Sequence, residues 1–233
     1  MKNRKNNTPL FWDREYKTQG HLALSDNPSE DLIKFTRWLE REHGRKFLNA
    51  TTSALDLGCG NGRNLIYLAK HFGIRGVGYD ISGEAVNLAK KLSDDLPISY
   101  ETRSIAGALP LPDASHMFVL DMMTSHFLKA SERKNLIAEI ARVLKIGGWF
   151  FWKTFLLDED VHAERLLRES PSGEVGSYIH PKIGVAEHVF TEEEVTEALS
   201  EKFFIHKITK SHNHRLAGKI AKRRSMSIYA ERV

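Results

Sequence analysis

A glycine-rich turn constrains the fold of this chain more than any other segment of the sequence. The turn, GCGNG at 58–62, follows the short apolar segment 53–57, and the apolar side chains of 61–71 recur at helical spacing. A strand, a tight turn and a helix in this order predict a βα unit. Glycines in such a turn let a ligand approach the backbone closely. The turn therefore predicts an α/β fold and a ligand site together.

The same alternation of strand and helix signals continues along the chain. Strands are predicted at 53–57, 74–79, 97–102, 117–122, 149–155, 203–209 and 225–231. Helices are predicted at 28–42, 61–71, 82–93, 131–144 (closed by Gly147 and Gly148), near 160–169 and from Thr191 onward. Helices between successive strands imply right-handed βαβ units in a parallel sheet. We expect an α/β three-layer sandwich with a Rossmann-like seven-stranded sheet and a terminal antiparallel hairpin.

Composition excludes several other classes of protein. The chain has 233 residues, of which 41% are hydrophobic and 27% charged, as in soluble globular proteins. Its single cysteine, Cys59, excludes an intramolecular disulfide framework and a cysteine-rich zinc site. The longest apolar run is interrupted by Lys153 and is too short to span a bilayer. No secretory signal is recognised at the N-terminus, so we expect a cytoplasmic protein with no membrane contact and no metal.

The residues around the turn narrow the choice of ligand. A dinucleotide-binding turn needs a small residue at position 63, which is Arg63, and no G-K-[ST] follows as in a Walker loop. Asp56, just before the turn, is an unfavourable neighbour for a pyrophosphate. Asp80 lies 18 residues beyond Gly62, at the end of the second strand, where an acid can accept hydrogen bonds from ribose hydroxyls. These residues favour a ligand that carries a ribose and an amino group.

Four motifs carry a resemblance to a known family. They are ALDLGCGNG (54–62), VGYDIS (77–82), LPLPDAS (109–115) and EIARVLKIGG (139–148), and in this order residues 50–155 resemble class I S-adenosylmethionine-dependent methyltransferases. The resemblance implies S-adenosylmethionine as cofactor and S-adenosylhomocysteine as product. It implies that the cofactor is held at its methionine end by Asp56, Gly58, Cys59 and Gly60, at its ribose by Asp80, and at its adenine by Ile81, Ser104, Ile105 and Ala106. Asn61, Asp121 and Met122 complete the cofactor-binding set.

We expect residues 1–233 to form a single methyltransferase domain with four parts. These are an N-terminal helical cap (1–50), a cofactor-binding core (51–155), a substrate-side insertion (156–190) and a C-terminal helix with a basic hairpin (191–233). The segment Phe11-Trp12-Asp13-x-x-Tyr16 is similar to the start of thiopurine- and tellurite-type small-molecule methyltransferases. In those proteins an aromatic N-terminal segment covers the cofactor. Here Trp12 or Tyr16 would close over the sulfonium, and a helix packed on the sheet edge is the alternative.

The acceptor is addressed mainly by exclusion. Base methylation through a covalent thiolate needs a cysteine near the acceptor, whereas Cys59 lies in the glycine turn. An Asn/Asp-Pro-Pro-Tyr turn, typical of amino methylation, is absent from the sequence after the fourth strand. Of the Lys-Asp-Lys-Glu set typical of ribose 2′-O methylation, only Asp121 and Lys153 are matched. We therefore expect a small-molecule acceptor. The long connection after the fifth strand is typical of a substrate lid, and our acceptor-side candidates are His126, His180, Glu187 and His188.

The charge distribution leaves an alternative open. Residues 202–233 carry nine Lys and Arg side chains and one acid, whereas the other 201 residues carry 25 basic and 29 acidic side chains. This strip is either a solvated sheet edge or a phosphate contact of an RNA methyltransferase, made through Lys219, Lys222, Arg223 and Arg224. RNA binding of that kind weakens steeply as salt rises. A cofactor-binding partner subunit without transferase activity is a further alternative, which cofactor turnover would exclude.

Overall fold

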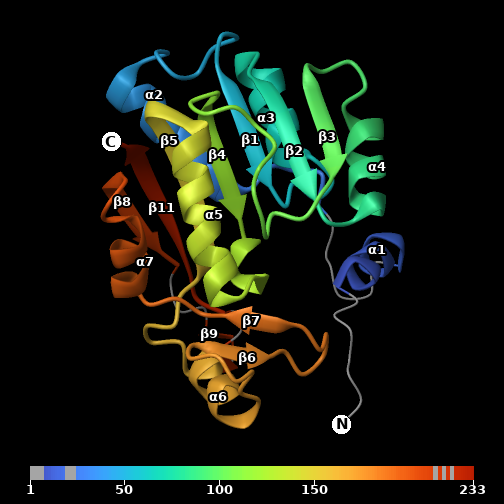
Figure 1. Ribbon diagram of the computed structural model, residues 1–233, viewed down its shortest axis with the longest axis vertical. Coiled ribbons are helices and arrows are strands. Elements are labelled where there is room, and N and C mark those ends of the chain that lie inside the picture. Colours follow the sequence, from blue (N-terminus) through green and yellow to red (C-terminus); the bar gives the residue numbers. More distant parts are fainter. Residues whose placement is uncertain (1–7, 19–24, 212–214, 217–218, 221–222) are drawn as a thin grey trace. The chain divides into compact units, whose positions relative to one another are not determined.

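The computed structural model describes residues 8–18, 25–211, 215–216, 219–220 and 223–233 (Figure 1). The chain divides into two compact units, which we call the first unit (Met1–Ile105) and the second unit (Ala106–Val233). Within the described residues, no helix is both long and apolar enough to cross a membrane.

The first unit contains a parallel sheet in the order β3-β2-β1. Its strands are β1 (Ser53–Leu57), β2 (Arg75–Asp80) and β3 (Ile98–Thr102). Its helices are α1 (Thr8–Thr18), α2 (Glu30–His43), α3 (Arg63–Phe72) and α4 (Gly83–Leu92). Helix α3 joins β1 to β2 and α4 joins β2 to β3, as the alternation predicts. The Ser82 hydroxyl accepts a hydrogen bond from Ala85 N, which caps the start of α4.

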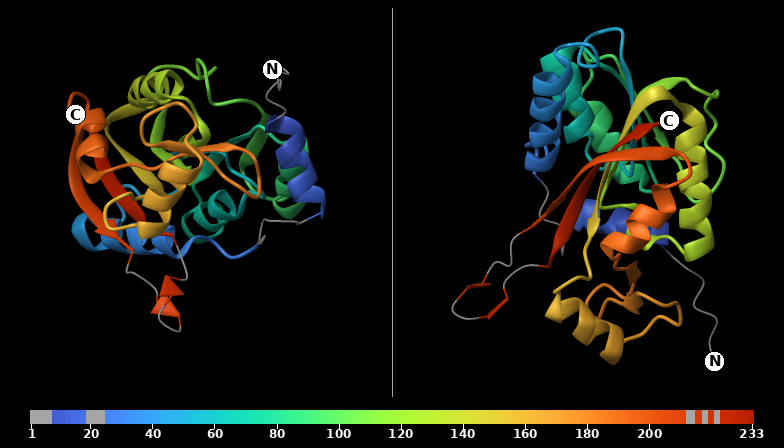
Figure 2. Two further views of the ribbon diagram at one scale, coloured as in Figure 1. Left: turned by 90° about the horizontal axis from the view of Figure 1, so that it is seen from below. Right: turned by 90° about the vertical axis from the view of Figure 1, so that its left-hand side faces the viewer.

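The second unit supplies four strands in the order β4-β5-β11-β8. Strands β4 (His116–Met122) and β5 (Leu144–Phe155) are parallel, and β11 (Ser225–Arg232) is antiparallel to both β5 and β8 (Phe203–Lys210). Figure 2 shows β8 and β11 side by side, so the predicted terminal hairpin is confirmed. With the three strands of the first unit, these strands confirm the predicted Rossmann-like α/β fold class. The helices of this unit are η1 (Ser125–Phe127), α5 (Ala130–Val143), α6 (Val161–Glu169) and α7 (Glu192–Leu199), and Arg215–Leu216 (β9) pairs with Lys219–Ile220 (β10).

Two expectations about the second unit are wrong: the closure of helix α5 by glycines, and the long loop at 156–190. Helix α5 is not closed by a glycine pair, because it ends at Val143 and β5 begins at Leu144, so Gly147 and Gly148 lie inside the strand. Gly147 has a positive φ of 75°, and the pairing of β4 with β5 is irregular between His116 and Phe118. The glycines therefore serve an irregular strand rather than a helix end.

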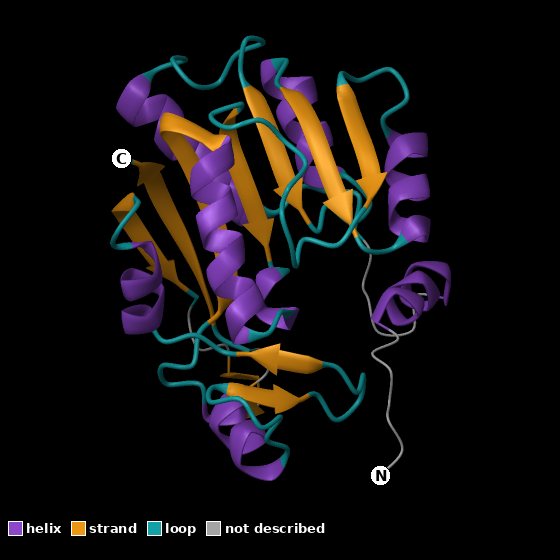
Figure 3. Cartoon of the chain, in the orientation of Figure 1, coloured by secondary structure: helices purple, strands orange, loops and turns teal. Residues whose placement is uncertain are grey.

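The segment expected as a long loop contains a small antiparallel sheet. Strand β6 (Ser177–Ile179) pairs with β7 (Ala186–His188), and α6 lies against them (Figure 3). Burial of apolar side chains holds this part together: Ala163 and Leu166 of α6 pack with Tyr178 and Val189. Residues 156–190 are therefore a folded element with its own small core.

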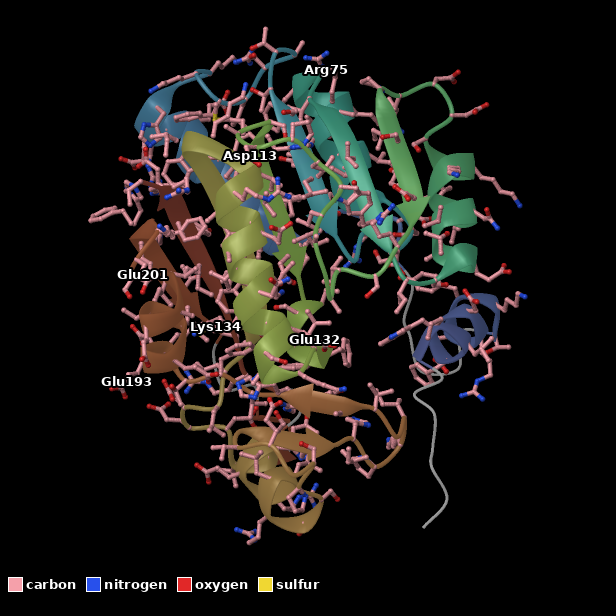
Figure 4. All side chains as sticks on the ribbon, in the orientation of Figure 1. Arg75, Asp113, Glu132, Lys134, Glu193 and Glu201 are labelled. Carbon is pink, nitrogen blue, oxygen red and sulfur yellow. The ribbon has the colours of Figure 1, made fainter. Side chains whose placement is uncertain are left out.

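The third and fourth sequence motifs are joined by one arginine of α5. Arg142 donates to the carbonyl oxygens of Leu109 and Leu111 (2.8 Å each) and to the Asp113 carboxylate (2.7 Å). The Glu139 carboxylate accepts from Leu109 N (2.7 Å) and from Arg142. Figure 4 shows Asp113 beside α5. The spacing of the two motifs thus reflects a contact that fixes the loop before β4 against α5.

In the first unit, the ring of Tyr100 packs against two glycines. A Cβ atom on Gly78 would lie 2.6 Å from Tyr100 Cδ1, and one on Gly62 would lie 2.8 Å from Tyr100 Cζ and closer still to its hydroxyl. Gly62 also has a φ of +77°, which L-residues rarely adopt. Position 62 therefore admits only glycine while Tyr100 is in place.

Gly62→Ala is expected to destabilise the protein by about 3 kcal/mol, because left-handed strain and overpacking add. The matched control is Gly184→Ala, where φ is +68° and nothing lies within 4 Å of the added methyl, so that only strain of about 1 kcal/mol is expected. Urea unfolding at neutral pH measures both. Adding Tyr100→Phe to Gly62→Ala should restore part of the loss. Equal losses at positions 184 and 62 would contradict the packing argument.

Candidate functional site

The glycine turn is held against the end of β2 by backbone hydrogen bonds. Gly58 N and Cys59 N both donate to Tyr79 O, at 2.7 and 2.9 Å. Gly62 N donates to Cys59 O at 3.0 Å and closes the turn. This curvature requires a positive φ of 56° at Gly60. The result is a turn whose backbone lies beside the last residue of β2, Asp80.

The Asp80 carboxylate links the turn to the start of α4. Its Oδ2 accepts from Gly60 N and its Oδ1 from Ser82 N, both at 2.9 Å. The side chain is 8% exposed, and this burial raises its pKa, while the two N–H donors act in the opposite direction. The structure thus brings together Gly60 and Asp80, the residues predicted for the methionine end and the ribose of the cofactor.

Three other predicted cofactor residues lie in the same turn or on the strand before it. Asp56 lies on β1 and is fully buried. Cys59 is buried, and burial followed by the charges of Asp56 and Asp80 raises its thiol pKa. The thiol is therefore protonated and serves as a small packing group. Asn61 Nδ2 donates to Ser25 O (3.1 Å) and Asp26 Oδ1 (3.3 Å), so this side chain holds the segment that leads into α2.

Helix α1 brings one aromatic side chain to the turn. A Cβ atom on Gly60 would lie 2.5 Å from the Tyr16 hydroxyl oxygen, so this hydroxyl reaches the middle glycine. Burial, followed by the Asp80 charge, raises the pKa of Tyr16, which therefore remains a neutral phenol. Trp12 is half-buried and packs edge-on against Phe11, with ring centroids 4.9 Å apart.

The predicted adenine residues follow Asp80 and β3. Ile81 is half-buried, Ser104 is exposed and Ile105 is buried. Arg103 N donates to Asp80 O at 2.7 Å, which ties this segment to the end of β2. Ala106, Asp121 and Met122 belong to the second unit, where Ala106 and Met122 are half-buried and Asp121 is buried.

In the second unit, Asp121 shapes the turn that leads into η1. Its Oδ1 accepts from Thr124 N (3.1 Å) and Ser125 N (3.2 Å). Trp152 Nε1 donates to Ser125 Oγ at 3.1 Å and anchors the turn to β5. Asp121 is 1% exposed, and burial raises its pKa to about 6 against the opposing effect of these hydrogen bonds.

This turn carries His126, which is 2% exposed. Its ring packs on Phe127 and Phe155, with centroids 4.0 and 4.9 Å away. Burial, followed by the charges of Arg223, His188 and Arg133, lowers its pKa to about 3, so the imidazole is neutral at pH 7. Among the described residues, neither ring nitrogen has a hydrogen-bond partner. Buried polar atoms are normally hydrogen-bonded, so the two ring nitrogens of His126 are an exception in this unit.

The other three acceptor-side candidates make separate contacts inside the second unit. His180 Nδ1 accepts from Lys182 N and Ile183 N (3.3 Å each) and shapes the turn between β6 and β7. His188 bridges Ser177 Oγ and Glu194 Oε1 at 2.8 Å each. In the third contact, Glu187 accepts from the Tyr178 hydroxyl. The structure places these three side chains in hydrogen bonds of the fold, which distinguishes them from His126.

Sequence reasoning missed an ionic network around Arg223. Its Nε lies 3.2 Å from Asp160 Oδ2 and its Nη1 lies 3.4 Å from Glu187 Oε2. The guanidinium carbon lies 4.1 Å from the centre of the Phe155 ring. Asp160 lies 63 residues before Arg223, and no local pattern signals such a pair. The only hint in the sequence is that the 156–190 segment carries several acids and the tail carries bases.

The residues predicted to contact RNA are only partly visible. Arg223 is engaged as described, and Arg224, 8% exposed, donates to Glu159 Oε2 and Asp158 O at 2.7 Å. Both arginines are therefore already paired with acidic partners or carbonyls of the same unit. Lys222 and the side chain of Lys219 lie outside the described residues.

Comparison with known proteins identifies a methyltransferase domain within the chain. Residues 54–148 match the family described as "Methyltransferase domain". A fatty-acid O-methyltransferase of Mycolicibacterium smegmatis is 24% identical over 72% of this chain and 61% of its own length. The 27-O-demethylrifamycin SV methyltransferase of Amycolatopsis mediterranei is 34% identical over 59% and 51%. The human EEF1A lysine methyltransferase 2 is 28% identical over 68% and 70%. The chain thus spans half to 70% of the length of these curated relatives.

Solved structures share the fold. A crystal structure of an S-adenosylmethionine-dependent methyltransferase from Methanosarcina mazei is 24% identical and has a TM-score of 0.68 over 83% of this chain and 97% of that one. The motifs, the matched region and this fold agree. Residues 54–148 therefore carry a methyltransferase domain with the class I fold, whose cofactor is S-adenosylmethionine.

The raised pKa of Asp121 predicts a pH-dependent stability. Its folded-state pKa of about 6 exceeds the ordinary value of an aspartate. Its contribution to the free energy of unfolding is therefore fully present below about pH 4 and is lost as pH rises through 6. Asp121→Asn keeps an acceptor for the two N–H groups and cannot ionise. We expect the free energy of unfolding of the wild type, relative to this variant, to fall by about 2 kcal/mol between pH 4 and 7.5. Urea titrations of both proteins at the two pH values measure this, and parallel pH profiles would contradict it.

Proposed function

We propose that the protein transfers the methyl group of S-adenosylmethionine to a small-molecule acceptor. The observation that carries the proposal is the Asp80 carboxylate, hydrogen-bonded to Gly60 N at the end of β2 and buried beside an open-backbone glycine turn. A carboxylate in this position suits two ribose hydroxyls.

The residues present fit this cofactor. Gly60 carries no side chain, so a ligand can approach the backbone of the turn closely, and the Tyr16 hydroxyl lies at the same face of Gly60. Asp80 would hold the ribose, and Asp56 with the turn would hold the amino-acid end. When bound, the cofactor would supply a methyl group activated by a positively charged sulfonium: the acceptor's lone pair would form a bond to the methyl carbon as the sulfur–carbon bond breaks, and S-adenosylhomocysteine would leave. The carboxylates of this part of the first unit complement that positive charge.

His126 is the residue that we propose on the acceptor side. A neutral buried imidazole with two unsatisfied nitrogens can accept a hydrogen bond from an acceptor hydroxyl at one nitrogen and donate one from the other, and so hold the acceptor in position. After burial, the groups that most lower its pKa are Arg223, His188 and Arg133, in that order. Their charge disfavours an ammonium beside His126 and favours a hydroxyl or a carboxylate. We therefore propose an oxygen nucleophile rather than an amine.

The names of two relatives support this acceptor class, since both describe O-methylation of small molecules. The name of a third, a lysine methyltransferase, is the reason to test protein acceptors as well. The engagement of Arg223 and Arg224 with Asp160 and Glu159 disfavours their use as phosphate contacts for RNA.

Asp80→Ala is expected to weaken binding of S-adenosylhomocysteine at least about 100-fold, because two charge-assisted hydrogen bonds are lost. Asp80→Asn, which keeps one acceptor oxygen, should lose less. Calorimetric titration measures the dissociation constants, with and without bulk tRNA. Glu101→Ala is the matched control, since it removes an exposed carboxylate of neighbouring β3 that pairs with Arg103. A folded Asp80→Ala protein with unchanged affinity would refute the ribose assignment.

The acceptor is tested by transfer of a tritiated methyl group to panels of carboxylic acids, alcohols and phenols, amines, lysine peptides and tRNA. We expect labelling of oxygen acceptors. His126→Phe keeps the aromatic packing and should lower kcat/KM about 100-fold, because the acceptor is no longer held in position, with unchanged affinity for S-adenosylhomocysteine. His206→Phe, on the edge strand β8, is the matched control. Labelling confined to amines, peptides or tRNA would contradict the proposed acceptor class.

A further inference from the structure

Helix α1 is tied to the start of α4 by a single carboxylate. Asp13 Oδ1 accepts from the Ser82 hydroxyl at 2.7 Å and from Glu84 N at 3.3 Å. The first N–H groups of a helix have no partner within the helix and carry its positive dipole end, so a carboxylate is well placed there. Figure 1 shows α1 beside the end of α4 that follows β2. Asp13 therefore fixes α1 at one defined point of the first unit.

Tyr16 lies one turn beyond Asp13 on the same helix, and residues three apart share a helix face. The face that meets α4 through Asp13 therefore also directs Tyr16, whose hydroxyl reaches Gly60. The groups that most affect its pKa after burial are Asp80, Cys59 and Arg63. Tyr16 is thus surrounded by the residues of the glycine turn and by the carboxylate assigned to the ribose.

Ser82 connects the two carboxylates. Its hydroxyl donates to Asp13, and its backbone N–H donates to Asp80 Oδ1 at 2.9 Å. The same hydroxyl accepts from Ala85 N. A shift of α1 that breaks the Asp13 contact therefore acts directly on the residue that orients Asp80. The ion pair of Lys17 with Glu84 adds little, because both side chains are exposed.

We propose that Asp13 is a positioning residue for the cofactor. It latches α1 onto α4, holds Tyr16 at Gly60 and, through Ser82, steadies Asp80, so that α1 forms one wall of the S-adenosylmethionine site. Docking of α1 and binding of the cofactor then stabilise one another, since such coupling is reciprocal. This inference rests on the proposed cofactor function and assigns a role to a residue outside the glycine turn.

Asp13→Ala is the first test. We expect affinity for S-adenosylhomocysteine, measured by calorimetry, to fall about tenfold, because two hydrogen bonds that order α1 are lost. Hydrogen exchange of residues 8–18 should be faster in the variant. Addition of S-adenosylhomocysteine should slow this exchange in the wild type and do so less in the variant. Arg14→Gln is the matched control on the same helix, since Arg14 is exposed and its guanidinium lies over the Phe11 ring of α1. In this variant the affinity for S-adenosylhomocysteine should remain within twofold.

A double-mutant cycle separates the latch from a general loss of stability. If Asp13 acts through Ser82, then Asp13→Ala combined with Ser82→Ala should weaken binding by less than the product of the single effects. Tyr16→Phe should weaken binding with unchanged exchange of α1. Unchanged affinity in Asp13→Ala would overturn the latch, and tighter binding in Tyr16→Phe would show that Tyr16 obstructs the ligand and overturn it as well.

The failure of this inference is distinguishable from failure of the proposed function. Loss of binding in Asp80→Ala together with full binding in Asp13→Ala would leave the cofactor function standing and remove the latch. A wild-type protein that binds neither S-adenosylmethionine nor S-adenosylhomocysteine would overturn both.

Discussion

The packing of the Tyr100 ring against bare backbone is the constraint on which the first unit depends. The ring, on β3, lies across Gly78 of β2 and reaches Gly62 at the start of α3. Because neither glycine has a side chain, β3, β2 and the turn come close enough for Gly58 N and Cys59 N to reach Tyr79 O. That curvature places Gly60 N on the Asp80 carboxylate. The proposed cofactor site is therefore a consequence of dense packing beneath the turn, as well as of the residues in it.

The second unit is organised differently, around buried charges. Asp160 caps α6 by accepting from His162 N and Ala163 N, and it also accepts from Arg223 and from Arg224 N. One carboxylate thus joins the start of α6 to the residues that lead into β11. Removing charges from water is costly unless each is paired and hydrogen-bonded. The Tyr178 hydroxyl and Glu187 complete the set around Arg223. The polar groups of the 156–190 segment accept hydrogen bonds from Arg223 and Arg224, and these contacts help to order the segment.

The sequence allowed the fold to be predicted wherever a pattern was long or local. The seven strands follow from apolar runs, and the Ser82 and Thr191 helix starts follow from capping residues, each confirmed by a hydrogen bond to the N–H three residues later. Strands β6 and β7 were missed because three residues carry no measurable period. Glu194 binds His188, a contact that only the folded 156–190 segment creates. For the same reason, the sequence could not show that Arg223 pairs with Asp160 and Glu187. Nor could it show that the ring nitrogens of His126 have no hydrogen-bond partner among the described residues.

The charges of the two units differ in a way that matches the proposed chemistry. Asp13, Asp56 and Asp80 lie at or near the glycine turn, and a cationic cofactor gains from carboxylates held at low exposure. His126, by contrast, is affected mainly by arginines and kept neutral by burial. A neutral imidazole can accept a hydrogen bond from a hydroxyl, whereas the same positive charges repel an ammonium. Because the sulfonium already activates the methyl group, positioning contributes more than acid–base chemistry. The contacts that hold α1, Tyr16 and Asp80 in place are therefore the part of the proposed site that would position the methyl donor.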